Sequence, residues 1–232
     1  MKNFYYSIII PVLNEEKNIN KLTLKIRKYC KKHNYEVIFV DDNSIDGSQK
    51  IFQSLSKKFK NIKFYIRKEK QKDLSASIIL GIKRSKYNTI VVMDGDLQHD
   101  PMYLPNIFDI YNNNNPDFLI CVRNFKKRRG LSILRYFASL ALIIIVNTLL
   151  HKKTSDPMSG FFIFKKKLFY KYRRSLFGRG FKFLFDILYQ KNKNFKIIEY
   201  EITFKKRKNN SSKMSLKILL NLVFLIFKKL FT

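Results

Sequence analysis

Four short apolar runs, separated by stretches with helical spacing, organise the first 93 residues. The first run, residues 7–10, is continuous and β-branched, as expected of a parallel strand that is buried on both faces. Apolar residues then recur at helical spacing, and the alternation repeats through runs at residues 36–40, 62–66 and 89–93. This βαβαβαβ pattern predicts an α/β fold with a mostly parallel sheet covered by helices on both sides.

The fourth run ends in two carboxylates, Asp94 and Asp96, with the amide of Gln98 two residues further on. Ligands of open α/β sheets bind at the carboxyl ends of strands. Alternation along an extended chain lets the three side chains point the same way, provided that the extension continues through Gln98. Such oxygen ligands suit Mg²⁺ or Mn²⁺, whose coordination is completed by substrate phosphates and water. An isolated Asp-x-Asp is more often a solvated turn, so other motifs must decide.

Three other polar motifs accompany the acidic one. Residues 11–15 follow the first run, residues 40–48 include the second run's acidic end, and residues 155–161 come later. In this order and spacing, the motifs resemble those of the inverting nucleotide-sugar glycosyltransferases of family 2. The resemblance is closest to the polyprenyl (dolichyl) phosphate mannosyltransferases and extends from about Tyr6 to Lys213.

The resemblance implies a GT-A fold, with a catalytic domain at residues 1–213 and a short amphipathic, membrane-associating tail at residues 214–232. It also implies a metal site formed by Asp94, Asp96 and Gln98. The residues implied to bind the donor are Pro11, Asn14, Glu15, Asp41, Asp42, Asp46 and Asp94. Helix capping is the alternative for several of them, because Asn and Ser are good N-caps and acidic residues favour the first turn.

A cationic acceptor side is implied as well. The implied catalytic residues are Asp96, Arg123, Arg135 and Asp156, and those implied to bind the acceptor phosphate are Arg123, Arg135, Ser159, Arg207 and Lys213. A phosphate monoester has a second pKa of about 6, so it is largely ionised near neutral pH and needs a cationic clamp rather than a general base. Asp156 is expected to bind the sugar or to orient a catalytic arginine. The alternatives are an Asp-Pro turn and, at residues 205–213, a solvated charged loop.

Three positions depart from the family pattern. Asp73 and Ser75 stand where relatives usually carry a Gly-x-Gly, and glycines there allow the backbone to approach the donor closely. The two larger side chains are expected to narrow and recharge that space, which leaves the nucleotide and the sugar open. Asp186 stands where relatives more often have Glu.

The net charge of +30 predicts a polyanionic partner, which is nucleic acid, an anionic membrane surface or a phosphorylated substrate. No signature of an RNA- or DNA-binding motif accompanies this charge, so no nucleic acid partner is predicted. Cys30 and Cys121 form no spacing motif and are expected to stay reduced. No signal peptide is evident, because the apolar stretch at residues 4–12 is short and is followed by Glu15.

Two apolar segments are candidates for membrane contact. Residues 131–150 are long enough to span a bilayer, but a complete crossing would separate the acidic motif from Asp156. We therefore expect helices that lie in the membrane interface, with Arg135 turned toward the site; a buried core helix is the alternative for residues 138–149. The tail, residues 215–232, is too short in apolar length to span and is expected to form an interfacial helix.

Together these features predict an inverting transferase that uses Mg²⁺ or Mn²⁺ to move a sugar, with GDP-mannose favoured as donor, onto a polyprenyl phosphate. It is expected to act peripherally at the cytoplasmic face of a membrane, with a small membrane-anchoring protein as a further partner to consider. One alternative is a related transferase with UDP-glucose, another donor or a non-lipid acceptor. The other is a non-catalytic basic module that binds a membrane surface or nucleic acid.

Overall fold

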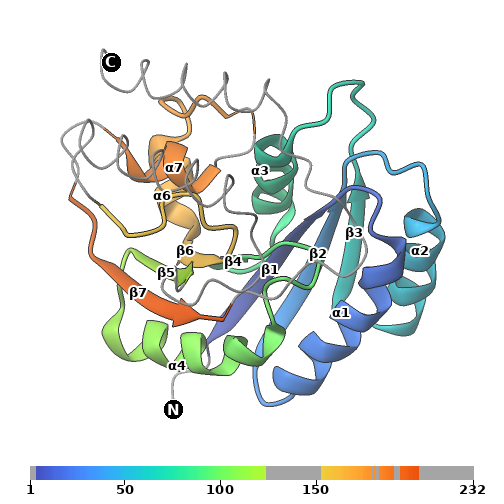
Figure 1. Ribbon diagram of the computed structural model, residues 1–232, viewed down its shortest axis with the longest axis horizontal. Helices are drawn as coiled ribbons and strands as arrows, with labels where there is room; N and C mark the ends of the chain where they lie inside the picture. The colour runs from blue at the N-terminus through green and yellow to red at the C-terminus, as the bar shows by residue number, and fades with distance from the viewer. Residues whose placement is uncertain (1–3, 124–152, 179, 181–182, 191–193, 204–232) are drawn as a thin grey trace, which may run out of the picture.

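The computed structural model describes residues 4–123, 153–178, 180, 183–190 and 194–203. In these residues the strands form one seven-stranded sheet with the order β3-β2-β1-β4-β6-β5-β7. The strands are β1 (Tyr5–Val12), β2 (Asn34–Asp41), β3 (Ile62–Ile66), β4 (Thr89–Val92), β5 (Phe118–Arg123), β6 (Phe162–Lys165) and β7 (Ile197–Ile202). Only β6 is antiparallel to its neighbours, β4 and β5 (Figure 1). The predicted mostly parallel sheet is confirmed.

Helices cover both faces of the sheet (Figure 1). One face carries α1, α2 and α4 and the other carries α3, α6 and α7. Strand alternation supplies both cores: Ile8 and Ile10 of β1 face the first group of helices, and Ile9 faces the second. The helix bounds are α1 (Glu16–Tyr29), α2 (Ser48–Lys58), α3 (Leu74–Arg84), the 3-10 turn η1 (Pro101–Tyr103), α4 (Leu104–Asn114), α6 (Lys166–Tyr172) and α7 (Phe183–Leu188).

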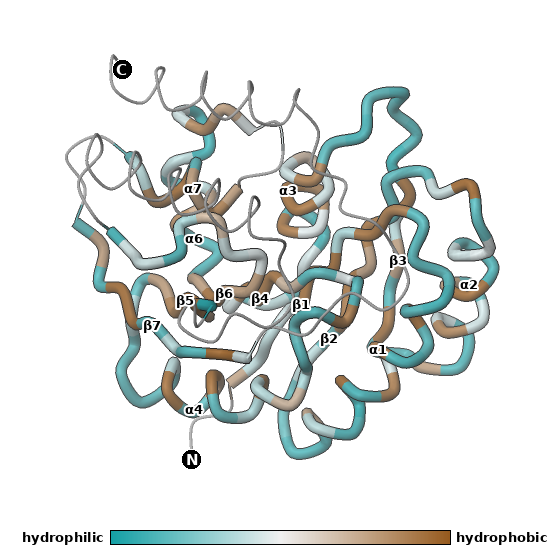
Figure 2. The backbone as a smooth tube through the Cα atoms, viewed as in Figure 1, coloured by the Kyte–Doolittle hydropathy of each residue, from teal (hydrophilic) through white to brown (hydrophobic). Residues whose placement is uncertain are grey.

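The hydropathy of the chain follows these layers. Figure 2 shows hydrophobic residues concentrated along the strands and hydrophilic residues in the outer loops. In β1 and β4 nearly every residue is buried, which explains why their sequences read as continuous apolar runs rather than as an alternation.

β1 and β2 extend beyond the apolar runs that predicted them, because they pair with each other over their full lengths. β7 pairs with β5 from Ile197 to Ile202. No helix in the described ranges is both long enough and apolar enough to cross a membrane. Residues 131–150 and the tail at residues 214–232 lie outside those ranges, so the interfacial helices stay a prediction.

Candidate active site

The acidic motif begins where β4 ends. The Met93 N–H donates to the Ile9 carbonyl at 3.2 Å, which continues the β1–β4 pairing up to Asp94. The Asp94 side chain is 34% exposed, and its Oδ2 lies 3.4 Å from Nδ1 of the buried His99. The Asp94 carboxylate is therefore accessible to a ligand at the carboxyl edge of the sheet, where a substrate of an α/β protein is expected.

The chain does not stay extended through Gln98, so the condition under which all three side chains would point the same way is not met. Gly95 and Asp96 form a turn, and Leu97 has a φ of 63° in the left-handed region. Within this turn the Gln98 N–H donates to Asp96 Oδ1 at 3.0 Å. The acidic motif is thus held by a closed turn, and strand alternation does not set the direction of its last residue.

The oxygen-rich motif fits a hard divalent cation in its chemistry. Asp94 and Asp96 offer carboxylates and Gln98 an amide oxygen, the ligand types that Mg²⁺ and Mn²⁺ prefer. Across the described ranges, no three His, Cys, Asp or Glu side chains gather in a way that would hold a metal ion. A metal at this motif would therefore need ligands beyond the carboxylates, such as the Gln98 amide, water and substrate phosphate.

The motif at residues 155–161 packs directly against the acidic motif. A Cβ atom placed on Gly160 would lie only 2.4 Å from Asp94 Oδ2, so the absence of a side chain permits this contact. Ser159 links β5 to the loop before β6. Its hydroxyl donates to the Cys121 carbonyl at 2.6 Å and accepts from the Phe161 N–H at 3.1 Å. Ser159, predicted to bind the acceptor phosphate, thus has a hydroxyl that contacts the backbone on both sides.

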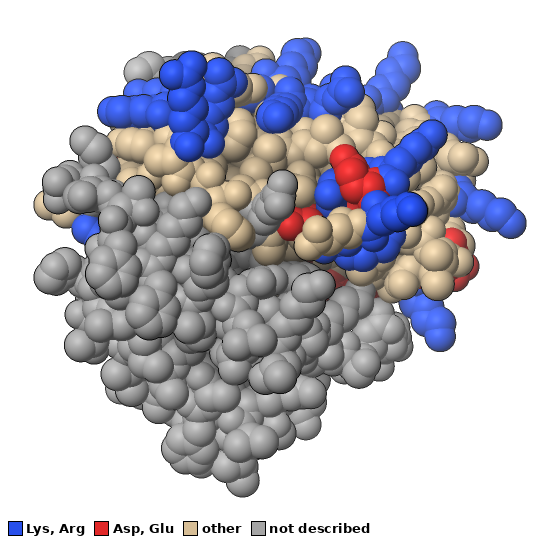
Figure 3. All heavy atoms as spheres, turned by 90° about the horizontal axis from the view of Figure 1, so that it is seen from above, with Lys and Arg blue, Asp and Glu red and all other residues tan. Residues whose placement is uncertain are grey.

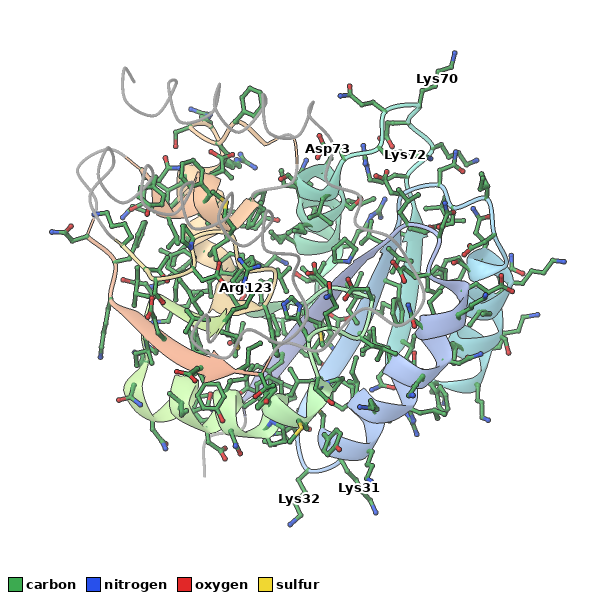
Figure 4. All side chains as sticks on the ribbon, viewed as in Figure 1. Lys31, Lys32, Lys70, Lys72, Asp73 and Arg123 are labelled. Atoms are coloured by element: carbon green, nitrogen blue, oxygen red, sulfur yellow. The ribbon has the colours of Figure 1, made fainter. Side chains whose placement is uncertain are left out.

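Arg123 and Asp156 form a two-pronged ion pair. Nε of Arg123 donates to Asp156 Oδ2 at 2.7 Å and Nη2 donates to Oδ1 at 2.9 Å, while Asp156 is fully buried. Burial alone would lower the pKa of Arg123, but the charge and hydrogen bonds of Asp156, with the charge of Asp94, raise the pKa. Arg123 lies at the end of β5, toward the middle of the molecule (Figure 4). The ion pair thus fixes a positively charged guanidinium close enough to Asp94 for the Asp94 charge to raise the pKa of Arg123.

Asp41 and Asp42, at the end of β2, contact different partners. Asp41 is fully buried, and its carboxylate accepts from the Ser44 hydroxyl and from the Ser44 N–H, the latter at 3.2 Å. Asp42 accepts from Arg67 Nη1 at 2.5 Å and from the Asp73 N–H at 2.5 Å. Burial raises the pKa of Asp42, and the Asp73 N–H and the Arg67 charge only partly offset this effect.

Arg67 is the partner that the sequence did not single out. It is nearly buried, follows directly after β3, and its N–H donates to the Asp41 carbonyl at 2.8 Å. A cation immediately after a strand that neighbours β2 is a signal that could have identified it. Together with Asp42 it places a buried ion pair at the donor side of the predicted site.

Two loops on the donor side are held together by side-chain hydrogen bonds. Asn14 has a φ of 54°, its N–H donates to Ser44 Oγ at 2.8 Å, and its Oδ1 accepts from the Ile45 N–H at 2.9 Å. Asn14 therefore bridges to the β2–α2 loop, and its bond to Ile45 is not a cap of α1. Pro11, a buried residue of β1, lies in register with Val40 of β2.

Glu15 and Asp46 support the starts of α1 and α2. Glu15 accepts from Asn18 Nδ2 at 2.6 Å, and Asp46 accepts from the Glu16 and Ser48 N–H groups, both at 3.0 Å. Burial alone would raise the pKa of Asp46, but the hydrogen bonds from Ser48 and Glu16 lower it overall. The capping alternative therefore describes these contacts of Asp46, and a donor contact of either residue stays a prediction.

Three predicted cations, Arg135, Arg207 and Lys213, lie outside the described residues. Asp186 is described, is almost fully buried in α7, and accepts from the Gly178 N–H at 2.9 Å.

Of the predicted site residues, the structure brings Asp94, Arg123 and Asp156 into one region, together with Gly160.

A sheet with carboxylates at its carboxyl edge and an arginine–aspartate ion pair beside them defines an α/β protein with a charged site at the edge where ligands of such sheets bind. The model of the glycosyl transferase family 2 matches residues 7–173, and the chain belongs to this family.

Two curated relatives are dolichol-phosphate mannosyltransferases. The one from Pyrococcus furiosus is 35% identical over 212 residues, which cover 90% of this chain and 58% of that protein. The one from Saccharomyces cerevisiae is 30% identical, with 93% of this chain and 83% of that protein covered. The chain thus spans little more than half the length of the first relative.

Among solved structures, glucosyl-3-phosphoglycerate synthase from Mycobacterium tuberculosis, in complex with Mn²⁺, UDP-glucose and phosphoglyceric acid, superposes with a TM-score of 0.70. The identity is 16%, and the match covers 97% of this chain and 78% of that one. This likeness concerns the fold alone, and it confirms the predicted GT-A architecture.

Proposed function

We propose that the chain transfers a sugar from a nucleotide-sugar donor to the phosphate of a polyprenyl phosphate, with mannose from GDP-mannose as the favoured donor. The observation that carries the proposal is the ion pair between Arg123 and the buried Asp156 near Asp94, because it supplies a fixed, partly exposed cation close to a partly exposed carboxylate. The two mannosyltransferase relatives, at 35% and 30% identity, support the choice of sugar and acceptor.

Asp94, Asp96 and Gln98 would hold the divalent cation, Mg²⁺ or Mn²⁺. When bound there, it would neutralise charge that grows on the departing diphosphate. The Mn²⁺ and UDP-glucose in the complex of the mycobacterial synthase support a metal in this reaction. On the donor side, the Asp42–Arg67 pair and the loops carrying Asn14 and Glu15 would bind the nucleoside.

Arg123 would orient the acceptor phosphate. Its two hydrogen bonds to Asp156 leave the guanidinium little rotational freedom, and a fixed planar cation suits recognition of a phosphate oxygen. A phosphate with a second pKa of about 6 is already a nucleophile near neutral pH, so no protein base has to remove a proton. Attack opposite to the leaving diphosphate inverts the anomeric centre. Arg135, Arg207 and Lys213 would complete the cationic acceptor side.

We expect the protein to act peripherally at the cytoplasmic face of a membrane, because the proposed acceptor is a lipid and the proposed donor is soluble. Lys and Arg side chains predominate over Asp and Glu on the face in Figure 3, which favours contact with anionic lipid. Residues 131–150 and 214–232 would lie in the membrane interface, and a small membrane protein is a further candidate anchor.

UDP-glucose with a non-lipid acceptor is the second candidate. The mycobacterial synthase complex contains UDP-glucose and phosphoglyceric acid, and Asp73 and Ser75 change the space where the donor is expected. A non-catalytic basic module that binds a membrane or nucleic acid is less well supported, because a bulk positive charge does not require the Arg123–Asp156 geometry.

Transfer of label from a donor into an organic phase tests the proposal. Purified protein with Mg²⁺ or Mn²⁺ and a polyprenyl phosphate is given labelled GDP-mannose or UDP-glucose, with and without chelator. We expect chelator-sensitive transfer from GDP-mannose and loss of this transfer in Arg123→Gln. Lys31→Gln is the control: it removes the same charge far from Arg123 (Figure 4) and should leave transfer normal. Nucleotide release without lipid labelling would identify a different acceptor, and transfer from UDP-glucose alone would favour the second candidate.

A further inference from the structure

Asp73 joins the start of α3 to a distant part of the chain. Its Oδ1 accepts from the Ala76 N–H at 2.9 Å and so caps α3, while its Oδ2 accepts from the Gly180 N–H at 2.7 Å. The Ser75 N–H donates to the Gly180 carbonyl at 2.8 Å, so both backbone polar groups of Gly180 are engaged. We call these contacts the Asp73 bridge; Asp73 is shown at the start of α3 in Figure 4.

The backbone of Asp73 faces the donor side. Its N–H donates to Asp42 Oδ2 at 2.5 Å, and its carbonyl accepts from Arg67 Nη1 at 3.0 Å. The same Nη1 donates to Asp42, so the three residues form a closed triangle of hydrogen bonds. All three are at least 90% buried, and hydrogen bonds in such surroundings are stronger than in water.

The other end of the bridge leads toward Asp94. Gly180 lies three residues before α7, in which the Phe183 ring stacks on Phe162 of β6 with ring centroids 6.3 Å apart. β6 begins two residues after Gly160, whose backbone lies against the Asp94 carboxylate. Asp73 therefore connects the Asp42–Arg67 pair, through Gly180, with α7, the helix that packs on β6.

We propose that Asp73 is a positioning residue, whose bridge couples nucleotide binding at Asp42 and Arg67 to the placement of Gly180 and α7. The inference rests on the proposed function in requiring a nucleotide donor. A nucleotide that contacts Asp42 or Arg67 restrains the Asp73 backbone, and the carboxylate passes this restraint to Gly180 through a second hydrogen bond. A glycine at position 73 could make neither side-chain contact.

Asp73→Asn separates the bridge from the helix cap. Asn caps helices as well as Asp does, but an NH₂ group replaces its second oxygen; with the amide oxygen facing the Ala76 N–H, a donor faces the Gly180 N–H and the bridge is lost. Ser77→Ala is the matched control on the same helix: it removes a hydroxyl that donates to the Asp73 carbonyl at 3.1 Å and leaves the Asp73 carboxylate contacts in place.

Amide hydrogen exchange at Gly178 and Gly180, with and without GDP or UDP and Mn²⁺, tests the coupling. We expect nucleotide to slow exchange by about tenfold in the natural chain and in Ser77→Ala, a size typical of coupling between sites. In Asp73→Asn we expect unchanged nucleotide affinity, no slowing, and a lower kcat for transfer with little change in the KM of the donor. Loss of thermal stability with normal kcat per folded molecule would show that Asp73 is only structural.

Other results distinguish the bridge from the proposed function. If nucleotide slows exchange equally in Asp73→Asn, or fails to slow it in the natural chain, the coupling is wrong while the transferase proposal stands. If the natural chain shows the coupling but labels no polyprenyl phosphate, the acceptor assignment is wrong and the bridge stands. If the chain binds no nucleotide, both proposals fail.

Discussion

At the scale of the residue, the site depends on side chains that neighbours hold in one orientation. Asp156 contacts Arg123 through both carboxylate oxygens, although 33 residues separate them in the sequence. Gly160 contributes by lacking a side chain, since any larger residue would meet Asp94 Oδ2. Each of these two contacts supports a prediction.

Arg123→Lys keeps the positive charge but loses the planar, two-pronged contact with Asp156. We expect kcat to fall by about a hundredfold, the size of effect that a misplacement of about 1 Å produces, while the KM of the donor changes little. Steady-state kinetics with the polyprenyl phosphate acceptor, together with a melting curve, measures this. Normal kcat in the lysine variant would show that charge alone is required.

Gly160→Ala adds one methyl group at a position where Cβ would lie 2.4 Å from Asp94 Oδ2. The Asp94 carboxylate must then move, so we expect a higher Mn²⁺ concentration for half-maximal activity and partial rescue at saturating Mn²⁺. Activity as a function of Mn²⁺ is the measurement, and a melting curve controls for unfolding. An unchanged Mn²⁺ dependence would remove Asp94 from the metal site.

At the scale of the element, the pattern of buried residues along each strand or helix determines how well the sequence could predict it. β1 and β4 were predictable because strands buried on both faces read as continuous apolar runs. β6 was not, since its four residues follow directly after a polar motif, end in the first of three lysines and show no period. α4 carries apolar residues at helical spacing, but a proline at its start and asparagines at its end resemble a loop.

The same contrast holds for the site. The closeness of Gly160 to Asp94 was predictable only from the order of the motifs, because no local pattern links positions so far apart. The pairing of Arg67 with Asp42 was missed, because the position of Arg67 directly after a strand is a weak signal in a chain with 47 Lys and Arg residues. The turn at Leu97 depends on backbone conformation that alternation rules do not describe.

Glu36 links three strands of the sheet and gives an element-scale prediction. It accepts from Lys63 Nζ at 2.8 Å, from Ser7 Oγ at 2.7 Å and from the Lys86 N–H at 2.6 Å. Burial alone would raise the pKa of Glu36, but these hydrogen bonds and the Lys63 charge lower it below its usual value. A carboxyl with a lowered pKa stabilises the fold fully above its unfolded pKa of about 4.3 and loses this contribution as the pH falls through its folded pKa.

We therefore expect Glu36→Gln to be less stable than the natural chain near neutral pH and the difference to shrink on acidification through that range. Urea unfolding at a series of pH values measures this. Lys57→Gln, at an exposed residue of α2, is the control for the loss of a surface charge. A stability difference that stayed constant with pH would mean that the Glu36 charge is not stabilised by the fold.

At the scale of the whole molecule, the two proposed substrates would account for two features of the chain. A soluble anionic donor would bind at the carboxyl edge of the sheet, and a lipid acceptor would require that this edge lie close to a membrane. The net charge of +30 would serve the second requirement, because each Lys or Arg near an anionic surface contributes about 1 kcal/mol. Such attraction acts over about 10 Å at 0.1 M salt, so it would bring the chain to the surface without fixing its orientation.

Apolar burial by the tail would fix that orientation, and deletion of residues 215–232 separates the two contributions. We expect the shortened chain to bind vesicles of anionic lipid more weakly and to be released at a lower salt concentration, because the apolar contribution is lost, whereas GDP affinity should not change. Vesicle sedimentation at increasing salt, with neutral vesicles as the control, gives both quantities. Unchanged partitioning would show that the tail is not the anchor, and the apolar segment at residues 131–150 would then be the one to test.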